Sequence, residues 1–272
     1  MRSPAVAGRF YPDDPAALRA SVARSFRMGP GEPGECTGER SISAVLAPHA
    51  GYECSGTCAA HAFKALAEDG RPDAYIVIGP DHYGVPYETV MCSDDYLTPL
   101  GRVPVHKDIA ARLRQFVPDD PRAHFREHSI EVELPFIQYI DPKAQVVPII
   151  MSRQTPGNAE RLAEAVKTAC LGYDVVIVAS SDLVHYVPHS YAEAADADFL
   201  KTVAAGEPGA VFDTVRRNGL TVCGYGPIAV AMMLSAPGRI KILNQTDSAV
   251  TLGMGYDSCV GYGSAVMYKP GR

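Results

Sequence analysis

Three stretches of this sequence place a histidine just after a run of apolar residues. VLAPHAGY carries His49, YIVIGPDHYG carries His82, and DVVIVASSDLVHY carries Asp182 and His185. Neutral imidazoles bind Fe, Zn, Cu or Ni, and positions left open on such a metal accept substrate or O2. A single histidine more commonly caps a helix or bonds a backbone carbonyl. The recurrence of the pattern makes a shared metal site an equally good hypothesis.

Other residues in the chain suit the same pocket. Cys223 in LTVCGYGPIAV precedes a predicted helix, where a thiolate has a lowered pKa and is a soft ligand, although a buried structural cysteine is more common. His128 and Glu131 in EHSIEVELPF lie three residues apart, so they share a helix face that points into the crevice or into solvent. Tyr52 and Tyr186 follow the histidine motifs closely, as pocket-lining or as packing residues.

A competing metal site is offered by Cys54, Cys58 and His61, whose spacings of four and three put side chains on one helix face. This group lacks a clear fourth ligand and does not match the paired CxxC spacing of structural zinc sites. We expect Cys58 and His61 to pack in the core or beside the main site. The chain has no GxSxG, P-loop, dinucleotide fingerprint or HExxH motif.

Predicted strands and helices alternate along the chain. Strands are expected at 42–47, 74–79, 88–93 (an edge strand), 145–151, 174–180, 239–245 and 259–268. Helices are expected at 14–26, 55–70, 106–116, 156–172, 191–206, 208–219 and 226–238, with a loop at 28–40. Within 127–140, which has helical spacing, Pro135 is expected to kink or end a helix. Ser55 is the expected N-cap of its helix, and Pro148 suggests an edge strand or a bulge.

This alternation predicts an α/β domain. Continuous apolar strands such as YIVIG and DVVIVAS favour a central, mostly parallel sheet with helices on both faces. Ligands of such sheets bind beyond the carboxyl ends of the strands, where the histidine motifs stand. The segment before the loop at 28–40 is too short to be a domain, so we predict one domain over residues 1–272.

Composition narrows the class of protein. The chain has 272 residues and a formal net charge of −6, which argues against a nucleic-acid-binding face. No apolar run approaches the ~20 residues of a membrane span, and the N-terminus lacks a signal-peptide core. We therefore expect a cytoplasmic protein with no membrane partner. Its seven scattered cysteines indicate reduced thiols.

Seven stretches, taken in order, resemble the Memo family, also called AmmeMemoRadiSam system protein B. They are AVAGRFYP, APHAGYECSG, IVIGPDHYG, EHSIEVELPF, SSDLVHY, CGYGPI and VGYGSAVMY, which run nearly from end to end. This family is similar in fold to the class III extradiol dioxygenases, non-haem iron enzymes that open catechol rings. The resemblance therefore implies a class III extradiol dioxygenase-like fold for the chain.

The resemblance also implies roles for particular residues. In the dioxygenases, two His and one Glu hold Fe(II), and a further His acts as acid and base. His49 and His82 match the two histidine ligands, and Cys223 stands where Memo proteins have Cys instead of that Glu. His185 matches the acid–base histidine, with Asp182 beside it. A thiolate favours Cu or Zn more than a carboxylate does, so we expect Fe(II) with Cu or Zn as alternatives, and ring opening does not follow from the fold.

Three functions remain open at this point. The first is an oxygen-dependent or redox enzyme, a non-haem metal-dependent oxidoreductase that acts on a small organic substrate. The second is a non-catalytic module that binds a metal, a peptide or a partner, since the family's name links it to a radical-SAM protein and an AMMECR1-like protein. The third is a zinc hydrolase in which His185 or Glu131 activates water.

Overall fold

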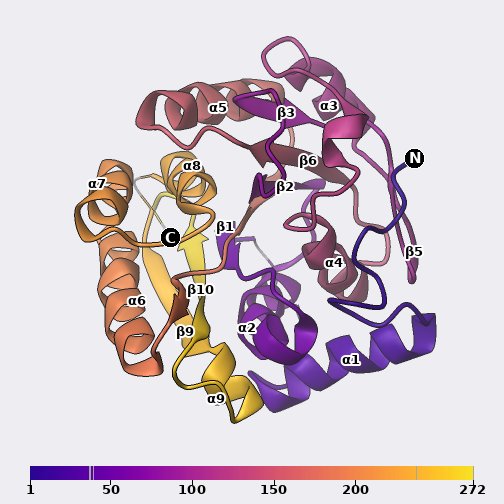
Figure 1. Cartoon of the computed structure of the whole chain (residues 1–272). Helices are drawn as coiled ribbons and strands as arrows, with labels where there is room; N and C mark the ends of the chain where they lie inside the picture. The colour runs from indigo at the N-terminus through magenta and orange to yellow at the C-terminus, as the bar shows by residue number, and fades with distance from the viewer. Residues whose placement is uncertain (37, 39, 237, 272) are drawn as a thin grey trace.

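A central sheet runs through the protein in the computed structural model, which describes residues 1–36, 38, 40–236 and 238–271 (Figure 1). Its strand order is β3-β6-β2-β7-β1-β10-β8, and β9 pairs with β10. The strands are β1 (Ile42–Ala47), β2 (Ala74–Pro80), β3 (Thr89–Met91), β6 (Val146–Met151), β7 (Val175–Ser180), β8 (His185–Val187), β9 (Ile240–Asp247) and β10 (Cys259–Tyr268). The inner strands β6, β2, β7 and β1 are parallel, which confirms the predicted fold class.

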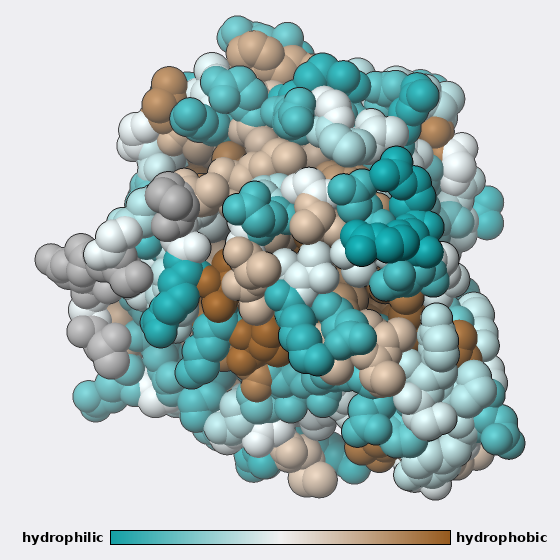
Figure 2. All heavy atoms as spheres, turned by 90° about the vertical axis from the view of Figure 1, so that its left-hand side faces the viewer, coloured by the Kyte–Doolittle hydropathy of each residue, from teal (hydrophilic) through white to brown (hydrophobic). Residues whose placement is uncertain are grey.

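Helices cover both faces of this sheet (Figure 1). They are α1 (Pro15–Met28), α2 (Tyr52–Asp69), α3 (Lys107–Leu113), α4 (Leu134–Ile140), α5 (Pro156–Ala169), α6 (His189–Ala204), α7 (Pro208–Asn218), α8 (Tyr225–Ser235) and α9 (Ser248–Leu252), with 3-10 turns η1 (Pro121–His124) and η2 (Glu131–Glu133). Helices α1, α2 and α4 pack together on one side, and α5, α7 and α8 pack on the other. On the face that carries α6 and α7, hydrophobic residues appear between hydrophilic ones (Figure 2).

The three strands that precede the histidine motifs are neighbours in the sheet, in the order β2-β7-β1. In the parallel register, Ala47 at the end of β1 pairs with Ser180 at the end of β7, and Ile78 of β2 pairs with Ala179 of β7. The strands are almost entirely buried and consist mainly of apolar residues, with Ser43 in β1 and Ser180 at the end of β7 as the exceptions. Their carboxyl ends therefore meet at one edge of the sheet, where the next residues of each chain segment converge.

The expectations for Ser55 and Pro135 need correction. Helix α2 begins at Tyr52, after an N-cap at Gly51, and the hydroxyl of Ser55 donates to the Ala50 carbonyl inside the first turn instead of capping the helix. Pro135 does not end a helix but lies in the first turn of α4. A proline is tolerated at this position because its missing N–H would have no partner inside the helix.

The prediction for Pro148 is also wrong. Its strand, β6, is an inner strand between β3 and β2, and Pro148 pairs with Val77 in a register that continues without a shift from 146 to 151. The carbonyl of Pro148 accepts the backbone N–H of Cys92. The edge position falls instead to β3, as expected for residues 88–93.

Several short elements were not predicted. They are β8, α9, η1, η2 and the antiparallel hairpin of β4 (Tyr96–Thr98) and β5 (Gly101–Val103). Residues 37 and 39 of the predicted loop, residue 237 of the predicted helix 226–238 and residue 272 of the predicted domain lie outside the described residues. Within the described ranges, no helix has both the length and the apolar character needed to cross a membrane.

Candidate metal centre

His49, His82 and Cys223 meet at the carboxyl edge of the sheet. One ligand atom from each of these residues lies within 4.8 Å of the other two. The Sγ atom of Cys223 lies 3.4 Å from Nε2 of His49, and the ring centroids of His49 and His82 are 5.3 Å apart. His49 follows β1, His82 follows β2, and Cys223 precedes α8, so three separate elements place one ligand each.

Both imidazoles are oriented by a contact at Nδ1. His49 Nδ1 lies 2.7 Å from the hydroxyl of Ser180, and His82 Nδ1 lies 2.9 Å from Oε1 of Glu127. Metal-ligating histidines commonly use one ring nitrogen in this way, which leaves the other for the metal. Burial lowers the pKa of His49, which keeps its ring neutral. Burial also acts to lower the pKa of His82, but the hydrogen bond with Glu127 and the negative charges of Glu127, Asp182 and Asp81 together outweigh it and raise that pKa.

The thiol of Cys223 differs from the expectation. We expected the start of the following helix to lower its pKa, but burial raises the pKa well above the usual value for a thiol, and the nearby charge of Asp182 adds to this effect. The backbone N–H of Asp182 donates to the sulfur across 3.2 Å. The group is therefore a thiol in the metal-free protein, and a bound cation would be needed to deprotonate it.

Glu127 is a site residue that the sequence did not reveal. Its Oε2 accepts the backbone N–H of His82 across 2.7 Å, and its Oε1 accepts the backbone N–H groups of His128 and Ser129. Burial would raise the pKa of this carboxyl, but the hydrogen bonds, led by that from His82, lower it to about 2. The residue stands 45 positions from His82, and no spacing rule connects the two.

His128 lies beside His49 and His82. Its ring stacks on that of His82 with centroids 4.5 Å apart, and its ring centroid lies 5.6 Å from that of His49. His82, Glu127 and His128 form a second group whose ligand atoms lie within 4.8 Å of one another. Burial lowers the pKa of His128 to about 4, so this ring is neutral at physiological pH.

Glu131 points elsewhere. Its carboxylate contacts the buried guanidinium of Arg2 and the hydroxyl of Tyr11, and it accepts the backbone N–H groups of Ala5 and Val6 at 2.8 and 3.0 Å. The side chain therefore holds the N-terminal segment of the protein. This corrects the expectation that Glu131 faces the crevice and is available to activate water.

The two tyrosines have different surroundings, and Tyr52 follows the second of the two expectations, which is packing. Tyr52 is buried in the hydrophobic core, and its hydroxyl donates to the backbone carbonyl of Val132 across 2.7 Å. Tyr186 is 78% exposed and has a φ of +59°, in the left-handed region. Its ring centroid lies 5.7 Å from that of His185. Tyr52 is therefore a packing residue, and Tyr186 lies on the surface beside the acid–base candidate.

Asp182 and His185 lie beside the ligands. Asp182 Oδ1 accepts the backbone N–H of His49 across 2.8 Å, and burial raises the pKa of this carboxyl to about 6. His185 Nδ1 lies 2.9 Å from the backbone carbonyl of Thr221. Because a carbonyl only accepts, Nδ1 carries the proton and Nε2 is the free basic nitrogen of this ring.

The competing group of Cys54, Cys58 and His61 does not converge. Among the described residues, two groups of at least three His, Cys, Asp or Glu have ligand atoms within 4.8 Å, and none of these three residues belongs to either. Cys58 is fully buried, as expected, and burial raises the pKa of its thiol to about 12. The helix-face spacing therefore reflects packing of α2 against the sheet.

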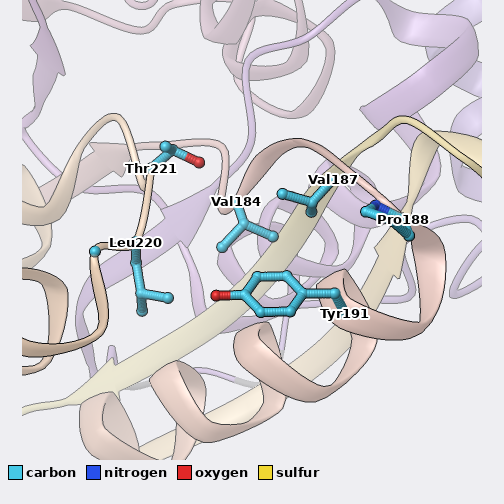
Figure 3. Close-up of a pocket in the computed structure, with 7 residues that line it drawn as sticks. Val184, Val187, Pro188, Tyr191, Leu220 and Thr221 are labelled. Atoms are coloured by element: carbon cyan, nitrogen blue, oxygen red, sulfur yellow. The ribbon is translucent and has the colours of Figure 1, made fainter.

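A shallow apolar groove of about 310 Å³ adjoins His185. It is lined by Val184, Val187, Pro188, Tyr191, Gly219, Leu220 and Thr221 (Figure 3). The ring of Tyr191 reaches from α6 toward Leu220 across this groove. Two of the lining residues connect the groove with His185: Val184 precedes it in the chain, and the carbonyl of Thr221 binds its ring.

This chain is similar in sequence to proteins of one family. The sequence model of the family described as "Memo-like protein" matches residues 2–266. A MEMO1 family protein of Methanopyrus kandleri is 36% identical over 99% of both chains, and one of Saccharolobus solfataricus is 37% identical over 96% of this chain and 97% of its own.

A solved structure shares the fold. The crystal structure of an uncharacterized protein from Escherichia coli K12 matches with a TM-score of 0.57 at 17% identity, and the match covers 83% of this chain and 99% of that chain. At this identity the likeness shows the fold alone, which is the α/β arrangement described above. The family match over nearly the whole length and the two relatives show that this chain belongs to the Memo family.

Proposed function

We propose that this protein is a metal-dependent oxidoreductase whose cation is held by His49, His82 and Cys223. The observation that carries the proposal is the meeting of these three ligands within 4.8 Å, with both imidazoles oriented at Nδ1. The substrate would be a small organic molecule in an oxygen-dependent or other redox reaction. Fe(II) is our first choice of cation, with Cu or Zn as alternatives.

The donor set fits such a cation. Two imidazoles and a thiolate suit Fe, Cu or Zn and do not suit Mg or Ca, which prefer oxygen ligands. Three protein ligands leave further coordination positions, and a cation there would supply redox chemistry and bind O2 or substrate. His128 stacks on His82 and offers a third imidazole at the same place.

The protein's own groups would position the substrate and move protons. His185 would take or give a proton at Nε2, since its Nδ1 is committed to the Thr221 carbonyl. Glu127 would keep the ring of His82 in place through Nδ1 and through the backbone N–H of the same residue. The apolar groove beside His185 would receive a nonpolar part of the substrate.

The proposal is tested by loading the protein with Fe(II) under anaerobic conditions and adding nitric oxide as a surrogate for O2. We expect an iron–nitrosyl signal in the electron paramagnetic resonance spectrum of the wild type and of His185→Gln, because His185 is not a ligand. The signal should be absent from His82→Ala. Iron-loaded wild type that gives no nitrosyl signal would overturn the oxygen-dependent reading.

A second candidate function is a binding module without turnover. It is favoured by the exposed Tyr186 and by the apolar groove, which offer a surface to a peptide or a protein beside the pocket. The partners would be a radical-SAM protein or an AMMECR1-like protein. A stable complex with either protein that is lost in His185→Ala would place the interface at the pocket, and no complex at micromolar concentrations would remove this candidate.

We also propose a cytoplasmic location. The cysteines at positions 36, 54, 58, 92, 170, 223 and 259 are all free thiols. A reducing compartment keeps thiols in this state and would protect the ligand Cys223 from oxidation. Fractionation of the source cells with an antibody against the protein would test the location directly.

A further inference from the structure

Glu133 is a buried carboxyl that none of the roles above uses. It belongs to η2, it is 0% exposed, and its Oε1 lies 2.7 Å from the hydroxyl oxygen of Ser180. Within the described part of the chain, its Oε2 has no hydrogen-bond partner. It interacts electrostatically with Asp182, which is another acid, and with the phenol of Tyr52. These surroundings do not favour a carboxylate, whose charge would need donors or a cation.

The hydroxyl of Ser180 fixes where the protons lie. Its Oγ is 2.6 Å from the carbonyl oxygen of Ser129, 2.7 Å from Nδ1 of His49 and 2.7 Å from Oε1 of Glu133. A hydroxyl has one proton to donate and two lone pairs to accept with. The Ser129 carbonyl can only accept, so the Ser180 proton points to it. The other two contacts are hydrogen bonds only if His49 and Glu133 both donate to Ser180.

We propose that Glu133 is a protonated, neutral acid at physiological pH, and that it donates to Ser180 and thereby holds this hydroxyl as the acceptor for Nδ1–H of His49. His49 then keeps its Nε2 lone pair toward Cys223 and the cation. Glu133 is thus a positioning residue, which acts on His49 through Ser180. The effect on His49 as a metal ligand rests on the proposed function. The protonation state of Glu133 does not.

The surroundings support this protonation state. Burial raises the pKa of Glu133 well above the usual value for a carboxyl, and the charge of Asp182 raises it further. The hydrogen bond with Ser180 acts in the opposite direction and is a weaker influence than burial. A neutral acid leaves only the carbonyl oxygen Oε2 without a partner, whereas a carboxylate would leave a buried charge that is poorly solvated.

The protonation state is tested by infrared spectroscopy of the metal-free protein. The difference spectrum between wild type and Glu133→Gln at neutral pH should show the loss of a protonated carboxylic acid band, which shifts in deuterated buffer. A difference spectrum that shows the loss of an ionised carboxylate band would overturn the inference. Glutamine is nearly isosteric and also donates to Ser180, so this variant is expected to fold.

The positioning role is tested by Co(II) affinity, read from the absorption of the bound ion. Glu133→Gln keeps a donor for Ser180 and should bind Co(II) within about twofold of wild type, whereas Glu133→Leu removes the donor and should bind about tenfold more weakly. Equal loss in both variants, or no loss in Glu133→Leu, would overturn the positioning role. If no variant and not even the wild type binds Co(II), the proposed function fails, and the infrared result still decides the protonation of Glu133.

Discussion

At the scale of single residues, the candidate centre depends on hydrogen bonds that decide which ring nitrogen faces the pocket. Ser180 is the hydrogen-bond partner of Nδ1 of His49, and Glu127 is the partner of Nδ1 of His82. Both histidines therefore present Nε2 to the space beside Cys223. Such second contacts raise the basicity of a ligand and fix its orientation, and their loss commonly weakens metal binding by about 10–100-fold.

We predict that Glu127→Gln weakens Co(II) binding by about 10–100-fold. The carboxylate accepts from four donors at once, namely Nδ1 and the backbone N–H of His82 and the backbone N–H groups of His128 and Ser129. In glutamine an NH2 group replaces one of the two accepting oxygens. This NH2 group would face N–H donors and repel them. The dissociation constant is measured by titration with Co(II).

The matched control for this experiment is Glu193→Gln, which makes the same change at an exposed position on α6. We expect it to bind Co(II) as the wild type does. Equal affinity of Glu127→Gln and the wild type would contradict the role that we assign to Glu127.

The sequence revealed the residues at strand ends but not those that orient them. The apolar runs before His49 and His82 mark these histidines, and the family resemblance adds Cys223. Glu127 carries no local signal, since its partner stands 45 positions away in the chain. The spacing of Glu131 from His128 suggested a pocket residue. In the structure its carboxylate binds the N-terminal segment, whose position the sequence pattern cannot predict.

At the scale of elements, the ligands come together because the backbone segments approach closely. A Cβ atom on Gly224, the N-cap of α8, would lie 2.5 Å from the Ser180 carbonyl oxygen at the end of β7. A Cβ atom on Gly79 of β2 would lie 2.3 Å from the hydroxyl oxygen of Ser129. Glycine at position 224 permits α8 to approach the end of β7, and glycine at position 79 permits β2 to approach the segment before η2.

We predict that Gly224→Ala destabilises the protein by about 1–3 kcal/mol, because the added methyl group meets backbone atoms that cannot turn aside. It should also weaken Co(II) binding, since the start of α8 and the adjacent Cys223 must move away from His49. Urea denaturation of the metal-free protein measures the first effect, and titration with Co(II) measures the second.

Gly209→Ala in α7 is the matched control, because a Cβ atom at this position meets nothing within 4 Å. This variant should retain both stability and metal affinity. If the two alanine variants unfold at the same urea concentration, the close approach at Gly224 does not constrain the site.

Elements were predictable where the sequence pattern is long and continuous. The apolar strands β1, β2 and β7 and the amphipathic α5, with its proline at the start, appear where they were expected. Strands of three residues, such as β4 and β5, contain too few positions for a period to show. The start of α2 was missed because Gly51 caps it with backbone geometry alone, without the side-chain signal that was assigned to Ser55.

At the scale of the whole molecule, polar side chains tie distant segments to one another inside the core. His124 of η1 is fully buried; its Nε2 lies 3.3 Å from the carbonyl oxygen of Val90, and its Nδ1 lies 2.7 Å from the hydroxyl of Tyr96. The carbonyl accepts from Nε2–H, and in the neutral ring the hydroxyl of Tyr96 donates to Nδ1. Burial lowers the pKa of His124 to about 4.

We predict that this histidine makes the free energy of unfolding depend on pH. The unfolded chain binds a proton at His124 below its ordinary pKa of about 6.5, whereas the folded protein resists that proton down to about pH 4. The stabilisation is therefore complete above pH 6.5 and is lost as the pH falls toward 4, by on the order of 3 kcal/mol. Urea denaturation at a series of pH values measures this loss.

The comparison that isolates His124 is the same series for His124→Gln. Glutamine does not titrate, so its unfolding free energy should fall less steeply between pH 6.5 and 4 than that of the wild type, whatever its stability at pH 7. Parallel curves for the two proteins would show that other groups cause the pH dependence.

The central claim, that His49, His82 and Cys223 form one metal site, is tested most directly by metal analysis of anaerobically purified protein, wild type beside Cys223→Ala. We predict close to one iron, or one copper or zinc, per wild-type chain and a marked loss of metal in the variant. Wild type that is pure, folded and free of these metals, or a variant that retains its metal in full, would contradict the claim.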